Sequence, residues 1–167
     1  MMIESSNPDY SKVSVQKLNE WLEYPANLFQ VLSYKSAVLG LLFTLRLKPE
    51  SFDGILNFTK KKEELTHGDF ASEEEPASLY ALAYYAMSPR IGTILLARLY
   101  AHLIAHQETL QELGIVSPLA EVHRIAENMG LKPTQRRETD PGPLIAYRND
   151  LFIVLSSPPV LKSLFEK

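Results

Sequence analysis

The stretch LFQVLSYKSAVLGLLFTLRL, residues 28–47, decides the fold because it is apolar along nearly its whole length. Its apolar side chains would cover most of the circumference of a helix, which is typical of a helix buried on all sides. Pro25 suits the first turn of such a helix, where its missing N–H is not needed. We therefore expect a central core helix that runs from about Pro25 to Leu47.

A membrane span is the alternative interpretation of residues 28–47. Lys35 lies in the middle of the stretch, and Gln30 and Arg46 lie near its ends. The uninterrupted apolar run is much shorter than the roughly 20 residues that a bilayer requires. A buried helix of a globular core explains the pattern better.

Residues that start and stop helices divide most of the remaining chain. Ser14 is a plausible N-cap, and Ser88 followed by Pro89 frames a helix start whose stop is Gly114. Ser72 and Glu75 have the spacing of a capping box. Together with the core helix, these start and stop residues predict helices over residues 14–23, 25–47, 52–68, 72–87, 88–114 and 117–130.

The composition changes after residue 130. Residues 131–143, LKPTQRRETDPGP, contain three prolines and alternating charges, which is typical of a linker or an ordered loop. Residues 143–157 resemble two short strands joined at Asn149 and Asp150.

The expected fold is therefore mainly α: a multi-helix bundle of about six helices with a small C-terminal β-hairpin. We expect one domain overall. Residues 1–130 would form the bundle, and residues 131–167 would form a linker, the hairpin and a short terminal helix packed on it.

The composition excludes several classes of function but does not indicate a particular one. The net charge of −3 provides no global basic field for nucleic acid or an anionic membrane. The chain has no cysteine, which excludes disulfides, thiolate zinc sites and a cysteine nucleophile. The first twelve residues lack the basic start and apolar stretch of a secretory signal, so we expect a cytoplasmic protein.

His102 and His106 are the first candidate site. Residues four apart lie on one face of a helix, so the two imidazoles could share a divalent metal ion. The residue after His102 is Leu103, where a zinc protease would need glutamate. The alternative is that both histidines fill the edge of an apolar seam, with no cofactor at all.

The segment EVHRIAENMGLKPTQRRET, residues 121–139, is the second candidate site. Ala126, Gly130 and Leu131, followed by a basic segment, resemble the first helix and turn of a helix-turn-helix DNA-binding unit. The resemblance implies phosphate contacts from the basic residues, which are Arg124, Lys132, Arg136 and Arg137. The alternative is that Arg136 and Arg137 pair with Glu138, Asp140 or other nearby acids.

No phosphate-binding glycine loop and no nucleophile elbow is found in the sequence. The leading hypothesis is therefore a non-catalytic helical interaction module that binds another protein or forms a homo-oligomer, with no membrane contact. A nucleic-acid-associated protein is the alternative: a degenerate winged helix-turn-helix or a small helical subunit of a ribonucleoprotein complex. A metal-binding protein or enzyme that uses His102 and His106 is the second alternative.

Overall fold

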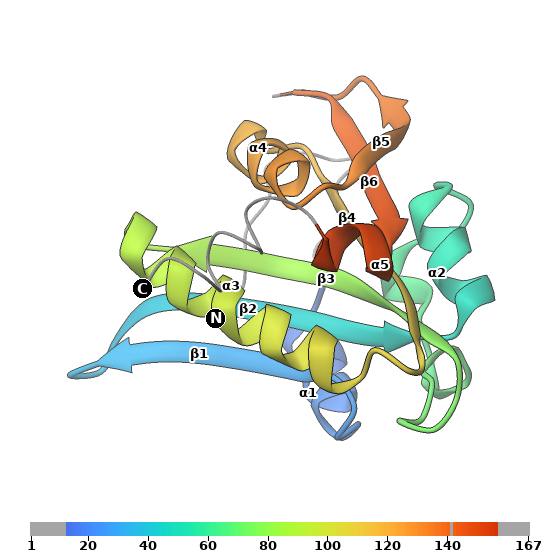
Figure 1. Cartoon of the computed structure of the whole chain (residues 1–167), viewed down its shortest axis with the longest axis horizontal. Coiled ribbons are helices and arrows are strands. Elements are labelled where there is room, and N and C mark those ends of the chain that lie inside the picture. The colour runs from blue at the N-terminus through green and yellow to red at the C-terminus, as the bar shows by residue number, and fades with distance from the viewer. Residues whose placement is uncertain (1–12, 141, 157–167) are drawn as a thin grey trace.

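A six-stranded mixed sheet forms the centre of the molecule (Figure 1). The computed structural model describes residues 13–140 and 142–156. The strand order is β1-β2-β3-β4-β6-β5, and neighbours are antiparallel except for the parallel pair β3 and β4. The strands are β1 (Leu28–Tyr34), β2 (Ala37–Leu47), β3 (Ala77–Ala86), β4 (Leu110–Ser117), β5 (Lys132–Arg137) and β6 (Leu144–Asp150).

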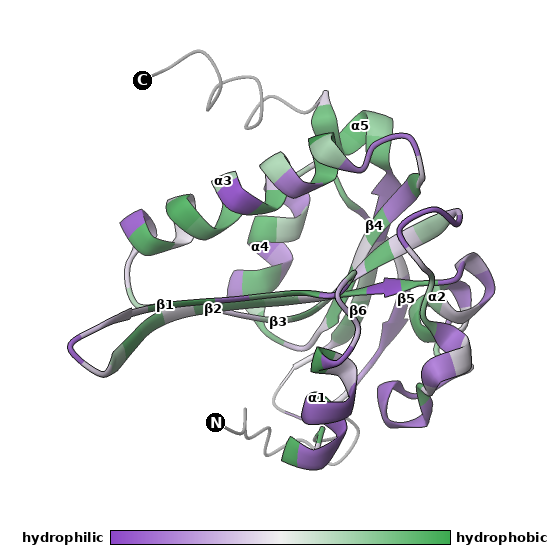
Figure 2. Ribbon diagram, turned by 90° about the horizontal axis from the view of Figure 1, so that it is seen from below, coloured by the Kyte–Doolittle hydropathy of each residue, from purple (hydrophilic) through white to green (hydrophobic). Residues whose placement is uncertain are grey.

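Helices cover both faces of this sheet (Figure 2). α3, α4 and α5 lie on one face, and α1 and α2 lie on the other. Each face has its own apolar core, the first built around Leu99 and Leu103 and the second around Trp21 and Phe52. The helices are α1 (Val15–Leu22), α2 (Pro49–Leu56), α3 (Pro89–Ala105), α4 (Ala120–Asn128) and α5 (Leu151–Leu155).

The expected mainly α bundle is therefore wrong: the protein has an α/β fold. Residues 28–47 form the hairpin of β1 and β2, and its turn is at Lys35 and Ser36. Their φ angles of 48° and 67° are the left-handed values that a two-residue hairpin turn requires. Leu41 and Leu42 point to opposite faces of β2, yet both are buried. A strand covered on both faces reads as a continuous apolar run, which imitates a core helix.

The helix expected over residues 72–87 is also absent, because residues 77–86 form the central strand β3. Alanine favours helices, but β3 pairs on both sides, with β2 and with β4, and these contacts override the local preference. The helix expected over residues 88–114 is correct as far as Ala105, after which the chain turns and forms β4.

Two expected helix starts are confirmed. The Ser88 side chain accepts a hydrogen bond from the Ile91 N–H, and the Ser14 side chain accepts one from the Lys17 N–H. Among the described residues, no helix is long and apolar enough to span a membrane.

The C-terminal part corrects two further expectations. The expected hairpin with a turn at Asn149 and Asp150 is wrong, because β6 pairs with β5 and with β4, and Asp150 directly precedes α5. After the turn at Gly130, the chain enters β5 instead of a second helix, so the helix-turn-helix interpretation is wrong as well. The strands before and after residue 130 belong to one sheet.

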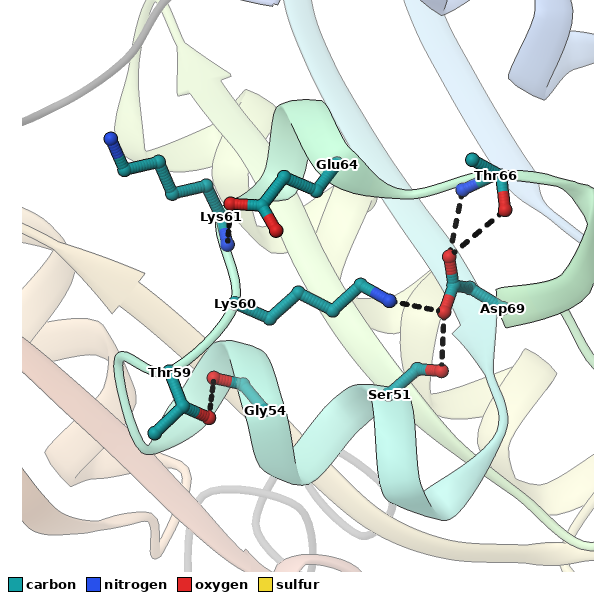
Figure 3. Close-up of polar contacts among 8 residues, drawn as sticks. All are labelled: Ser51, Gly54, Thr59, Lys60, Lys61, Glu64, Thr66 and Asp69. Atoms are coloured by element: carbon teal, nitrogen blue, oxygen red, sulfur yellow. Dashed lines mark hydrogen bonds and ion pairs between the residues drawn. The ribbon is translucent and has the colours of Figure 1, made fainter.

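A buried carboxylate holds the segment between α2 and β3 in place (Figure 3). Asp69 accepts hydrogen bonds from the Ser51 hydroxyl at 2.7 Å, from the Lys60 ammonium at 2.6 Å and from the Thr66 N–H at 2.7 Å. Burial acts to raise the pKa of Asp69, but these bonds together outweigh it and hold that pKa below its usual value. The cluster ties the segment to α2 and serves the architecture of this face.

Candidate functional site

The parallel strands β3 and β4 diverge halfway along their length. They pair from Ala77 and Leu110 as far as Ala81 and Ile115. In the described part of the chain no pairing between them continues past these residues. β3 goes on beside β2, and β4 goes on beside β6 to Ser117. The result is a V-shaped opening, with its apex at Ala81 and Ile115 and its mouth at the carboxyl ends of both strands.

A bulge in β3 coincides with the apex. Thr44 of β2 pairs with Ala81, and the next pair joins Phe43 to Ala83, so Leu82 has no residue opposite it. A bulge bends the strand that carries it and increases its twist. The bend therefore accounts for the separation of β3 from β4 at this point.

Two helices begin at the mouth of the opening. α3 begins at Pro89 directly after β3, and α4 begins at Ala120 shortly after β4. Because a helix N-terminus carries partial positive charge, such a place suits an anion. Exposed Arg90 adds a positive charge to the first turn of α3, whereas exposed Glu121 adds a negative one to the first turn of α4. An anion is therefore expected to bind at α3.

Tyr84 and Gly92 form one wall of the mouth. Tyr84 reaches from β3 to the first turn of α3, where a Cβ atom on Gly92 would lie only 2.5 Å from the Tyr84 hydroxyl oxygen. Glycine is therefore required at position 92 for Tyr84 to occupy this place. Burial raises the pKa of Tyr84, and the Glu121 carboxylate raises it further, so the hydroxyl stays protonated at neutral pH.

A cavity of about 30 Å³ lies behind the mouth, between the sheet and the helices α3 and α4. Among the described residues that line it, Tyr84 alone has a polar side chain, and the others are apolar residues or glycine. They come from β2, β3, β4, α3, α4 and the segment that follows α4. They include Leu99 of α3, Ala126 of α4, Leu113 of β4, and Met129 at the end of α4.

His102 and His106 lie near the opposite end of α3 from this mouth. Their ring centroids are 4.5 Å apart, and no residue in the described part of the chain forms a hydrogen bond with the buried Nε2 atom of His102. Among the described residues, no group of three or more His, Cys, Asp or Glu side chains is placed to hold a metal ion. Within residues 13–140 and 142–156, no third ligand accompanies this histidine pair.

Burial, together with nearby His106 and Arg46 and against the opposing effect of Glu73, lowers the pKa of His102 to about 4. The folded protein therefore holds fewer protons at this site than the unfolded chain, whose histidine has a pKa near 6.5. We expect the free energy of unfolding to be largest above pH 6.5 and to fall between pH 6.5 and 4, by less than about 1.4 kcal/mol per pH unit.

Urea denaturation at a series of pH values would measure this slope. His102→Gln should reduce the slope between pH 6.5 and 4 relative to the wild type. An unchanged slope in His102→Gln would show that His102 does not titrate in this way.

The four basic residues expected at a nucleic-acid surface lie on α4 and β5. Arg124 is exposed on α4, and Lys132 begins β5. Arg136 and Arg137 are successive strand residues and point to opposite sides of the sheet edge. Arg136 donates to Glu138 at 2.7 Å, and the Arg137 guanidinium lies 5.2 Å from the centre of the Phe58 ring.

Sequence reasoning missed Arg90 and Gly92 as site residues. The signal was present, because Ser88, Pro89 and Arg90 open a helix directly after an apolar segment. A strand followed at once by a helix start is a common anion-binding arrangement. The interpretation of residues 72–87 as a helix concealed it.

No family model matches the chain, and no curated protein matches it. Solved structures do match. FeeM, an N-acyl amino acid synthase from uncultured soil microbes, has a TM-score of 0.58 at 12% identity, over 87% of this chain and 84% of that one. GphF, a GNAT-like decarboxylase in complex with isobutyryl-CoA, has a TM-score of 0.58 at 16% identity, over 86% and 88%. MesI, a CoA-dependent acyl-homoserine lactone synthase, has a TM-score of 0.52 at 13% identity, over 99% and 78%.

At these identities the likeness shows the fold, which resembles that of GNAT acyltransferases. The hypothesis of a non-catalytic helical interaction module is therefore wrong, because the bundle on which it depended does not exist and the neighbours with this fold are enzymes. Its two alternatives, a helical nucleic-acid-associated protein and a metal protein built on a histidine pair, are overturned with it.

Proposed function

We propose that the protein is an acyltransferase that takes its acyl group from coenzyme A. The observation that carries this proposal is the opening between β3 and β4, with the N-terminus of α3 at its mouth and an apolar cavity behind it. A coenzyme A thioester has the same three parts in the same order: a diphosphate, an extended arm with two amide groups, and an acyl group.

The arm of the donor fits the inner edges of the diverging strands. A strand edge presents N–H and C=O groups that require partners, and an extended chain with amide groups can supply them as an added strand does. Neither inner edge is paired with the other strand beyond Ala81 and Ile115. The two amides of the arm would therefore replace part of the missing ladder.

The diphosphate fits the first turn of α3. Pro89 has no N–H, and the Ile91 N–H donates to the Ser88 side chain. We expect Arg90 to hold the diphosphate, with its own N–H and its exposed guanidinium, which is suited to bidentate contact with phosphate.

In the reaction, the nitrogen of an amine forms a bond to the thioester carbonyl carbon while the bond from that carbon to sulfur breaks. The amine loses one proton, the sulfur gains one, and the products are an amide and free coenzyme A. An amine acceptor is supported by the likeness to FeeM, which is an N-acyl amino acid synthase.

Arg90→Ala should weaken coenzyme A binding by about ten- to 150-fold, because one charge-assisted contact contributes about 1.5–3 kcal/mol. Isothermal titration calorimetry with coenzyme A measures the effect. Arg98→Ala is the matched control: Arg98 is exposed on the same helix, about 12 Å further along it, and its loss should leave the affinity unchanged. Equal affinities in both variants would place the diphosphate elsewhere, and failure of the wild type to bind coenzyme A would refute the proposed function.

A further inference from the structure

The cavity behind the mouth differs in chemistry from the mouth itself. The mouth carries charge from Arg90 and Glu121, but the cavity is lined by aliphatic side chains except at Tyr84. An amine acceptor placed there would lose its water without gaining a partner. An apolar cavity of this kind stays dry and suits hydrocarbon. The part of the donor that can occupy it is therefore the acyl group.

The direction of the elements shows which end of the cavity is closed. α3 and α4 follow their strands and run back from the mouth, so their later residues lie deeper than their first turns. Leu99 and Met129 occupy such late positions, and Leu113 of β4 belongs to the paired part of the V. All three are buried, with exposures of 2%, 6% and 1%. These three side chains close the inner end of the cavity, which we call its floor.

The size of the cavity sets both a lower and an upper limit on the length of the acyl chain. Its volume is about 30 Å³, which is more than the roughly 10–15 Å³ that one water needs but leaves room for only a few small groups. With the thioester carbonyl at the apex, an acetyl methyl leaves most of this space empty. The three carbons that follow the carbonyl in a butyryl group fill it, and the seven of an octanoyl group exceed it.

We propose that the cavity selects donors whose acyl group is a short aliphatic chain of about four carbons, and that Met129 sets the upper limit. This inference rests on the proposed function, because it places the arm of coenzyme A between β3 and β4. It adds the class of acyl group that the enzyme takes and names a residue that determines specificity.

Calorimetric titrations of the full chain with coenzyme A and with its acetyl, butyryl and octanoyl thioesters test the inference. Each methylene moved from water into the cavity should tighten binding about fourfold. The butyryl thioester should therefore bind about 15-fold more tightly than the acetyl thioester. The octanoyl thioester should bind more weakly than the butyryl thioester, because the floor stops the longer chain.

Two variants test whether the lining of the cavity sets the length of the acyl chain. Met129→Ala deepens the floor, so the octanoyl thioester should bind at least about tenfold more tightly than it binds the wild type. Ala126→Val narrows the cavity, so the preference for butyryl over acetyl should disappear. Met87→Ala, at a methionine that is 67% exposed and outside the cavity, should keep the wild-type preference. Melting temperatures confirm that each variant is folded.

The outcomes separate the two claims. Binding of coenzyme A with no preference among the three thioesters would overturn the inference and leave the proposed function intact. A wild-type affinity that keeps rising up to octanoyl, or an octanoyl affinity that Met129→Ala does not change, would also overturn it. Absence of coenzyme A binding would refute the proposed function and the inference together.

Discussion

An Arg46→Met variant is expected to lose about 3 kcal/mol of the free energy of unfolding, because a buried charged group with several hydrogen bonds is removed. Arg46 is 1% exposed. Its guanidinium donates to the carbonyls of Ser72, Glu73 and Glu75 at 2.8–3.2 Å and to the Thr109 hydroxyl at 2.9 Å. These bonds fix the acidic loop before β3 to the turn before β4.

Methionine keeps the length of the arginine stem, so the loss measures the bonds of the guanidinium more than a cavity. Chemical denaturation would give the value. Arg98→Met, at an exposed position on α3, is the control and should change the free energy of unfolding by less than about 0.5 kcal/mol. A loss below 1 kcal/mol in Arg46→Met would contradict the view that this arginine holds the loop to the sheet.

Gly92→Ala is expected to abolish measurable coenzyme A binding and to cost about 1–3 kcal/mol of stability, as overpacking does. The added Cβ would lie 2.5 Å from the Tyr84 hydroxyl oxygen. Tyr84 lines the cavity on its other side. The displaced ring must therefore move into the opening between β3 and β4 or push the first turn of α3 away, and either movement damages the donor site.

A second substitution tests this explanation. Without its hydroxyl, the ring at position 84 would come no closer to the added Cβ than its Cζ atom does, at 3.8 Å, an ordinary contact. The double variant Gly92→Ala with Tyr84→Phe should therefore recover both stability and coenzyme A binding, and Tyr84→Phe alone is the matched control. If the double variant instead loses as much stability and coenzyme A binding as the two single variants added together, the contact between residues 84 and 92 is not the cause of the Gly92→Ala defect.

The sequence predicted helix boundaries well wherever side chains cap the backbone. Ser14 and Ser88 cap helices as expected, because an N-cap is a local interaction between residues three apart. Prediction from the sequence failed for β2 and β3, because the conformation of these strands depends on partners that are distant in the chain. Leu42 belongs to the apolar core on one face of the sheet and Leu45 to the core on the other. Such burial on two faces erases the alternation that marks a strand.

The site could not be predicted because it arises from the arrangement of strands. Arg90 is unremarkable in the sequence, and its importance comes from a helix that begins beside a diverging strand pair. His102 and His106 carried a recognisable spacing, but spacing alone does not supply a third ligand. Expectations of a protein partner or homo-oligomer and of a cytoplasmic location remain predictions from composition.

Backbone hydrogen exchange, read amide by amide with and without saturating coenzyme A, would locate the ligand on the chain. We expect the ligand to slow exchange at the inner-edge amides of residues 82–86 and 116–117 and at the first turn of α3, since these groups gain partners on binding. Slowed exchange confined to other parts of the chain, with binding demonstrated, would contradict this expectation: coenzyme A would then bind outside the opening between β3 and β4.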